Sequence, residues 1–152
     1  MKKDTLYLLD ATALLYRAYF AFIRNPLVNS QGMNTSAIFG TVSSFLGFVQ
    51  KFEPQHVVVS FDRKAPTFRH ERSELYKANR PPMPDELIPQ VEPVKRFFSD
   101  IGLQDISLDG YEADDVLATL ALKLRDEYES WLLILAVLVL TAGRTCSEPR
   151  QG

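Results

Sequence analysis

The order of apolar and amphipathic segments predicts an α/β fold in which a mostly parallel sheet is flanked by helices. Two short apolar runs, at residues 5–9 and 57–61, are each followed directly by an aspartate. The stretches between and after them repeat their apolar residues with the period of a helix. Strands that alternate with helices in this way are typical of βαβ units and a parallel sheet. A chain of 152 residues with 46% hydrophobic residues is long enough for one domain with a proper core.

The first half of the chain predicts two strands separated by two helices. Residues 5–9 (Thr-Leu-Tyr-Leu-Leu) are apolar throughout, as in a buried strand, and the helical period then runs from residue 13 to 22. Asn-Pro and Asn-Ser-Gln-Gly turn signals follow this helix. Asn34 or Thr35 caps the next helix, and Pro54 lies just past its end. The β-branched run at 57–61 forms the second strand.

The second half predicts three helices and two further strands. A charged helix at 64–80 is stopped by the prolines at 81, 82 and 84, and an amphipathic helix follows at 85–101. Residues 104–108 are interpreted as a short strand and residues 112–127 as a helix with an acidic start. The apolar run 131–140 predicts a last buried strand.

Five carboxylates stand at element ends that meet in such a fold. Asp10 and Asp62 each follow a predicted strand, and ligands of open parallel sheets bind beyond the carboxyl ends of the strands. Glu112, Asp114 and Asp115 fall within four residues at the start of a predicted helix. In strict helical spacing Glu112 and Asp115 share a face, whereas Asp114 points away from it.

Crowded carboxylates indicate a magnesium site. Hard divalent cations prefer carboxylate oxygens, and two ions roughly 3.5–4 Å apart activate water and stabilise the leaving oxygen of a phosphodiester. The alternative is that each acid is only a helix cap or a solvated residue at a strand end, because acids are common in the first turn of a helix. The five together favour the metal site.

The segment from residue 63 to 80 is basic in a chain whose net charge is −2. It has six Lys and Arg residues against two acids, and Phe68 and Tyr76 lie among them. On a helix Arg69, Arg72 and Tyr76 share one face with Lys77 beside them, and His70 is expected to contact phosphate or the surface. Basic residues neutralise phosphates and aromatic rings stack on unpaired bases. Composition alone slightly favours a solvated charged helix, but the position of the segment directly after Asp62, beside the expected metal site, favours nucleic acid.

The remaining composition predicts a soluble cytoplasmic protein without a membrane span. The single cysteine allows no internal disulfide, and the first residues show no apolar signal segment. The apolar run at 131–140 is too short to cross a bilayer. No Ser–His–Asp arrangement, phosphate-binding glycine loop or zinc spacing is present.

Several long motifs resemble the 5′ nuclease domain of bacterial DNA polymerase I. They are Leu-Asp at 9–10, Leu-Leu-Tyr-Arg-Ala-Tyr-Phe at 14–20, Asn-Thr-Ser-Ala-Ile-Phe-Gly at 34–40, Phe-Asp at 61–62, Ala-Pro-Thr-Phe-Arg-His-Glu at 65–71, Tyr-Lys-Ala-Asn-Arg-Pro-Pro-Met-Pro at 76–84 and Gly-Tyr-Glu-Ala-Asp-Asp at 110–115. The resemblance covers about residues 4–128. It implies a resolvase-like, PIN-like 5′ nuclease fold with a basic helical arch.

The same resemblance implies a magnesium-dependent 5′–3′ exonuclease and 5′ flap endonuclease of DNA replication and repair, with Mn²⁺ as an alternative ion. Its partners are DNA with 5′ ends or flaps and, in the full-length protein, a polymerase domain. The implied metal ligands are Asp10, Asp62, Glu112, Asp114 and Asp115. Lys77 and Arg80 are implied at the scissile phosphate, and the implied DNA-binding residues are Arg17, Arg69, His70, Arg72 and Tyr76.

Residues 129–152 depart from the family pattern. The family continues into a Gly-Asp-x-Asp motif with further metal ligands, and this chain has neither aspartate after its apolar run. We therefore expect residues 1–128 to be the N-terminal part of the nuclease domain, and 129–152 to be an off-family tail that a frameshift would explain. One ion or none, instead of the family's two, and little or no activity are expected. The alternatives are a non-catalytic nucleic-acid-binding remnant and a PIN-like ribonuclease.

Overall fold

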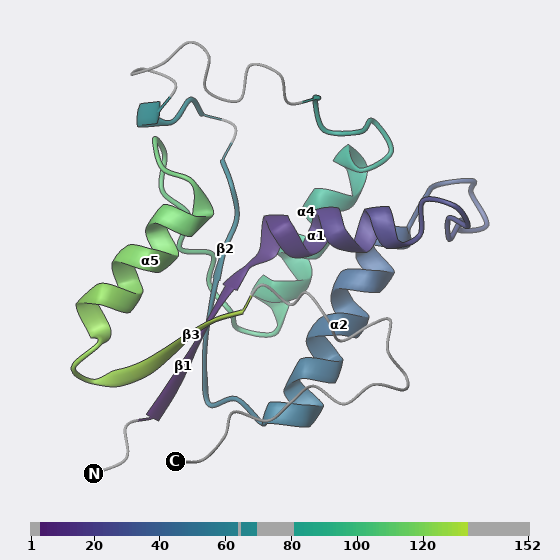
Figure 1. Ribbon diagram of the computed structural model, residues 1–152. Helices are drawn as coiled ribbons and strands as arrows, with labels where there is room; N and C mark the ends of the chain where they lie inside the picture. Colours follow the sequence, from purple (N-terminus) through teal and green to yellow (C-terminus); the bar gives the residue numbers. More distant parts are fainter. Residues whose placement is uncertain (1–3, 64, 70–80, 134–152) are drawn as a thin grey trace.

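A parallel sheet forms the centre of the computed structural model, which describes residues 4–63, 65–69 and 81–133 (Figure 1). Its strands are β1 (Asp4–Asp10), β2 (His56–Ser60) and β3 (Tyr128–Leu133), in the order β2-β1-β3. Leu9 lies opposite Val59 on one side and Leu133 on the other, so all the carboxyl ends point the same way. The predicted α/β fold with a parallel sheet is therefore confirmed.

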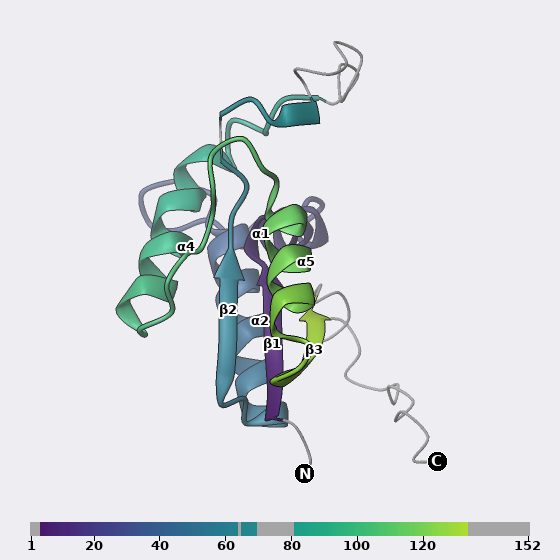
Figure 2. The ribbon, with the colours of Figure 1, turned by 90° about the vertical axis from the view of Figure 1, so that its left-hand side faces the viewer.

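Helices cover both faces of this sheet. Helix α5 (Ala113–Leu124) packs on one face, while α1 (Ala11–Ala21), α2 (Ser36–Phe52) and α4 (Ile88–Asp100) lie on the other (Figure 1). The view in Figure 2 places α5 in front of the strands and α2 behind them. No helix among the described residues is long and apolar enough to cross a membrane.

The alternation of side chains along β1 divides the core in two. Leu6 and Leu8 face α5 and pack with Leu117 in a small cluster. Leu9, from the opposite face of the strand, joins a larger cluster on the side of α1, α2 and α4. Both faces of the sheet are covered, which explains why the strands are apolar at nearly every position.

Two contacts fix the helices of the larger cluster. Gly40 of α2 faces Ala18 of α1 so closely that a Cβ added at Gly40 would lie 2.8 Å from the Cβ of Ala18. Gln90 of α4 is fully buried, and its Oε1 accepts hydrogen bonds from the N–H groups of Ala37 (2.8 Å) and Ile38 (3.2 Å) at the start of α2. The carbonyl of one helix side chain thereby satisfies the first N–H groups of another helix.

Most predicted elements match the structure within a few residues, but the strand at 104–108 is wrong. Only an isolated bridge joins Asp105 to Val59. The Asp105 carboxylate instead accepts from the N–H of Phe61 (3.3 Å) and from the N–H of Ser107 (2.9 Å), which turns the chain back on itself. Of the charged helix, residues 70–80 lie outside the described part, as do 134–140 of the last strand and the rest of the tail.

Candidate functional site

The two strand-end aspartates are tied into the structure by backbone hydrogen bonds. Asp10 is the N-cap of α1, and its Oδ1 accepts from the N–H of Ala13 at 2.8 Å. Asp62 lies two residues past β2, and its Oδ1 accepts from the N–H of Ala113, the first residue of α5, at 2.8 Å. The N–H of Asp62 donates to Oγ1 of Thr12, also at 2.8 Å. These bonds join the ends of β1 and β2 to the beginning of α5.

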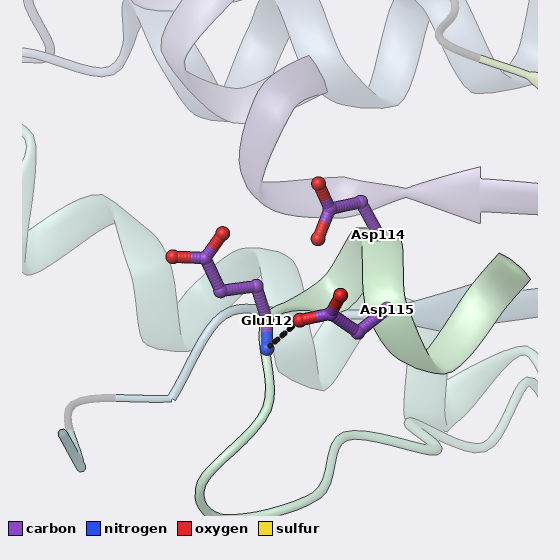
Figure 3. A group of neighbouring side chains, drawn as sticks. All are labelled: Glu112, Asp114 and Asp115. Carbon is purple, nitrogen blue, oxygen red and sulfur yellow. Dashed lines mark hydrogen bonds between the residues drawn. The ribbon is translucent and has the colours of Figure 1, made fainter. Parts of the chain in front are cut away.

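A capping box holds the acidic start of α5. Glu112 is an N-cap in extended conformation, and its side chain accepts from the N–H of Asp115. In return, Oδ2 of Asp115 accepts from the N–H of Glu112 at 3.2 Å (Figure 3). Glu112, Asp114 and Asp115 each offer a carboxylate oxygen within 4.8 Å of the others. The three carboxylates are therefore close enough to share one cation.

Asp114 points into the site, although strict helical spacing alone would turn it away from the face that Glu112 and Asp115 share. Its side chain is directed toward the junction of β1 and α1 (Figure 3), and it lines a cavity together with Asp10, Asp62 and Glu112. Asp115 is not among the residues that line this cavity. Helical periodicity describes the face of α5 that packs against the strands, whereas the site lies beyond the edge of the sheet at the start of α5.

The electrostatics of the site are those of crowded negative charge. Burial raises the pKa of the Asp10 carboxyl, and the hydrogen bond from the Ala13 N–H offsets part of this effect. The charges of Asp62 and Asp114 raise the pKa of Asp10 further. A bound cation would relieve this repulsion, and the carboxylate oxygens that line the cavity are the donors that a hard divalent ion prefers.

The cavity next to these acids has a volume of about 880 Å³ and a partly aromatic wall. Tyr16 and Phe20, one turn apart on α1, contribute rings whose centroids lie 6.4 Å apart at an interplanar angle of 27°. Phe20 is 53% exposed, so its ring is accessible from the solvent. Phe61, Met83 and Val91 continue the apolar lining. The cavity thus combines carboxylates with flat apolar surfaces.

The beginning of the basic segment rests on the start of α5. Arg69 donates to both oxygens of Asp115, with Nη1 and Nη2 each at 2.5 Å, and Nη1 lies 3.5 Å from Oε2 of Glu112. The N–H of Phe68 donates to the carbonyl of Gly110 at 3.0 Å. Gly110 adopts a φ of +85°, a conformation that favours glycine. The acidic motif and the basic segment therefore form one connected unit.

The predicted site residues fall into three groups. Asp10, Asp62, Glu112 and Asp114 converge on the cavity, and Asp115 adjoins them. Arg17 is exposed on α1 outside the cavity lining, and Arg69 pairs with the acids. The predicted residues that lie outside the described part of the chain are His70, Arg72, Tyr76, Lys77 and Arg80.

Sequence reasoning missed Thr12 and the aromatic pair Tyr16 and Phe20. The pair had a signal, because residues four apart share a helix face and this helix begins at Asp10. The hydrogen bond from Asp62 to Thr12 joins residues 50 positions apart, and no local sequence pattern predicts such a contact.

Comparison with known proteins places the chain among nucleases. The family described as 5′-3′ exonuclease, N-terminal resolvase-like domain, matches residues 5–142. DNA polymerase I of Treponema pallidum is 41% identical over 127 residues, which are 84% of this chain and 13% of that protein. The 5′-3′ exonuclease of Bacillus subtilis is 40% identical over 123 residues, which are 80% of this chain and 42% of that protein. The chain thus spans less than half the length of these relatives.

A solved structure shares the fold. T5 5′-exonuclease, in a structure with bound divalent zinc ions, superimposes with a TM-score of 0.64 at 19% identity. The match covers 85% of this chain and 48% of that one. The observed arrangement of sheet and helices is therefore the resolvase-like fold of 5′ exonucleases.

Proposed function

Because the chain belongs to the family of N-terminal, resolvase-like domains of 5′-3′ exonucleases, we propose that it is the metal-binding part of a DNA 5′ nuclease. The reaction is hydrolysis of phosphodiester bonds at 5′ ends and 5′ flaps. One observation carries the proposal: carboxylates from three separate segments, the ends of β1 and β2 and the start of α5, line a single cavity. Folding alone does not require this convergence, since burial and then the charges of Asp62 and Asp114 raise the pKa of Asp10, which costs stability at neutral pH.

The proposed cofactor is one Mg²⁺ ion, with Mn²⁺ as a substitute. Asp10, Asp62, Glu112, Asp114 and Asp115 are the proposed ligands, because four of them line one cavity and Asp115 offers an oxygen within 4.8 Å of Glu112 and Asp114. A bound divalent ion supplies an activated water and charge stabilisation for the leaving oxygen of a phosphodiester. That T5 5′-exonuclease binds divalent zinc ions supports this assignment by analogy of fold.

The chain's own residues would position the substrate. The exposed ring of Phe20 and its neighbour Tyr16 offer stacking surfaces to unpaired bases beside the acids. Lys77 and Arg80 are proposed to stabilise charge on the scissile phosphate. The residues proposed to contact other parts of the DNA are Arg17, Arg69, His70, Arg72 and Tyr76.

The relatives suggest the wider setting. Because the T. pallidum protein is a DNA polymerase I, we propose that this domain works beside a polymerase domain in replication and repair. A nuclease placed there would remove 5′ flaps ahead of DNA synthesis.

A cleavage assay on 5′-labelled flap DNA tests the function. We expect release of the flap in Mg²⁺ or Mn²⁺, none in EDTA, and loss of release in Asp62→Asn. Asp126→Asn removes an exposed acid away from the cavity and serves as the matched control. The little or no activity predicted from the absent Gly-Asp-x-Asp stays a prediction, which the rate in this assay measures.

Two outcomes would favour other functions. Tight flap binding without cleavage, retained in Asp10→Asn, would indicate a non-catalytic DNA-binding protein. Cleavage of single-stranded RNA in preference to flap DNA would indicate a PIN-like ribonuclease.

A further inference from the structure

The Arg69 guanidinium lies against the acidic start of α5, as a metal cation would. Its guanidinium binds both oxygens of Asp115 and approaches Glu112, as expected of the fork geometry that arginine offers to a carboxylate. The side chains are 30% exposed for Arg69, 20% for Asp115 and 10% for Glu112. Because water and salt screen such a pair less than a surface pair, the interaction is stronger than a surface salt bridge.

The same carboxylates belong to the candidate metal cluster. Oxygens of Glu112, Asp114 and Asp115 lie within 4.8 Å of one another, and Arg69 holds both oxygens of Asp115. A divalent ion that binds Asp115 must displace at least one guanidinium N–H from it. Even without contact, a positive charge at this distance weakens the attraction of the cluster for a cation.

Arg69 is also the point where the acidic cluster meets the basic segment. Its guanidinium lies over the ring of Phe68, 4.7 Å from the centroid. The N–H of Phe68 donates to the Gly110 carbonyl, and the ring centroids of Phe68 and Tyr111 lie 5.7 Å apart. These contacts hold the backbone near α5 while the Arg69 side chain exchanges partners. A guanidinium that leaves Asp115 would stay beside the acidic start of α5.

We propose that Arg69 is an internal counter-cation, which a divalent ion displaces from Asp115 and which then binds a DNA phosphate. The proposal rests on the proposed function, since it uses the same metal site. It assigns Arg69 a positioning role: the residue couples cation binding to DNA binding. Linkage requires this coupling to act equally in both directions.

Calorimetric titration of the DNA-free protein with Mg²⁺ tests the first half. In Arg69→Gln the cluster loses its counter-cation, so we expect Mg²⁺ to bind roughly tenfold more tightly than in the wild type. Arg69→Lys keeps the positive charge but loses the paired N–H groups of the guanidinium, so we expect an intermediate affinity for Mg²⁺. Arg96→Gln removes an exposed arginine that pairs only with Asp100 at 3.5 Å among the described residues, and serves as the control with unchanged affinity. If Arg69→Gln does not fold, as judged by circular dichroism, Arg69→Lys decides the test.

Binding of flap DNA with and without Ca²⁺ tests the second half. Wild-type protein is expected to bind DNA more tightly in Ca²⁺, and Arg69→Gln is expected to lose most of that gain. Equal or weaker Mg²⁺ binding in Arg69→Gln would overturn the proposal, because a merely structural arginine supports the site and does not compete for it. If neither protein binds Mg²⁺, the metal site itself fails and the proposed function fails with it.

Discussion

The Asp10 carboxylate, at the end of β1, has two opposite effects on the stability of the folded protein. It caps α1 through the Ala13 N–H, which favours folding. It is also partly buried near Asp62 and Asp114, which raises its pKa and disfavours the folded state at neutral pH. A carboxyl whose pKa is shifted by burial and by neighbouring charges is typical of a functional site.

Replacing Asp10 by asparagine should therefore stabilise the metal-free protein. Asparagine caps a helix as well as aspartate does but has no charge. Because the folded-state pKa is raised, the cost of ionised Asp10 appears as pH rises from the unfolded-state value through the folded-state value. We expect Asp10→Asn to raise the free energy of unfolding, and with it Tm, in EDTA at pH 7.

The gain in Asp10→Asn should vanish at a pH below the ordinary pKa of an aspartate, where both proteins are neutral at this position. Glu92→Gln on the exposed side of α4 is the control, with no gain at either pH. A Tm that falls in Asp10→Asn at pH 7 would show that the carboxylates do not repel one another in the folded protein.

The sequence indicated candidate site residues but did not fix the orientation of each side chain. Asp10, Asp62 and Glu112 could be proposed because strand ends and helix caps have fixed positions in a parallel α/β fold. For Asp114, helical periodicity describes only the face toward the core, so the direction of its side chain is given by the folded chain. The pair of Arg69 and Asp115 joins residues 46 positions apart, and only the folded chain brings them together.

At the scale of elements, the contact between α1 and α2 depends on one glycine. Gly40→Ala should lower the free energy of unfolding by about 1–3 kcal/mol, because the new Cβ would lie 2.8 Å from the Cβ of Ala18. A Cβ added at Gly47, in the same helix, would meet no atom within 4 Å, so Gly47→Ala should instead stabilise by roughly 0.5–1 kcal/mol. Urea unfolding of both variants measures the difference, and equal effects would refute the close helix contact.

The start of α2 depends on α4. Gln90→Leu removes the acceptor for the Ala37 and Ile38 N–H groups, and we expect a loss of about 1–3 kcal/mol in urea unfolding. Gln50→Leu on the exposed end of α2 is the control. A loss no larger than that of the control would mean that water or other groups satisfy these N–H groups.

The order and type of most elements followed from the sequence, but their capping followed only in part. Of the two predicted candidates for α2, Thr35 is the N-cap without a side-chain capping bond, whereas Oδ1 of Asn34 accepts from the N–H of Ser36 at 3.0 Å. Gln90 accepts from the next two N–H groups, and it lies in a helix more than 50 positions later. Local patterns identify a helix start, whereas the partner that satisfies it depends on packing between helices.

At the scale of the whole molecule, the sheet brings distant segments to one place. The parallel register sets the ends of β1 and β2 side by side, with Asp10 opposite Ser60. Helix α5 crosses the other face of the sheet, and its start reaches the same edge, where Ala113 bonds to Asp62. The two cores therefore position the carboxylates, and the sequence could predict this arrangement because parallel sheets have so few topologies.

The position of a bound Mn²⁺ ion tests the central claim most directly. Crystals of the protein grown with Mn²⁺ would locate the ion by its anomalous scattering. We predict a peak in the cavity, in contact with carboxylates from both strand ends and from the start of α5. A map with no peak there, or an ion bound only at other acids, would contradict the account.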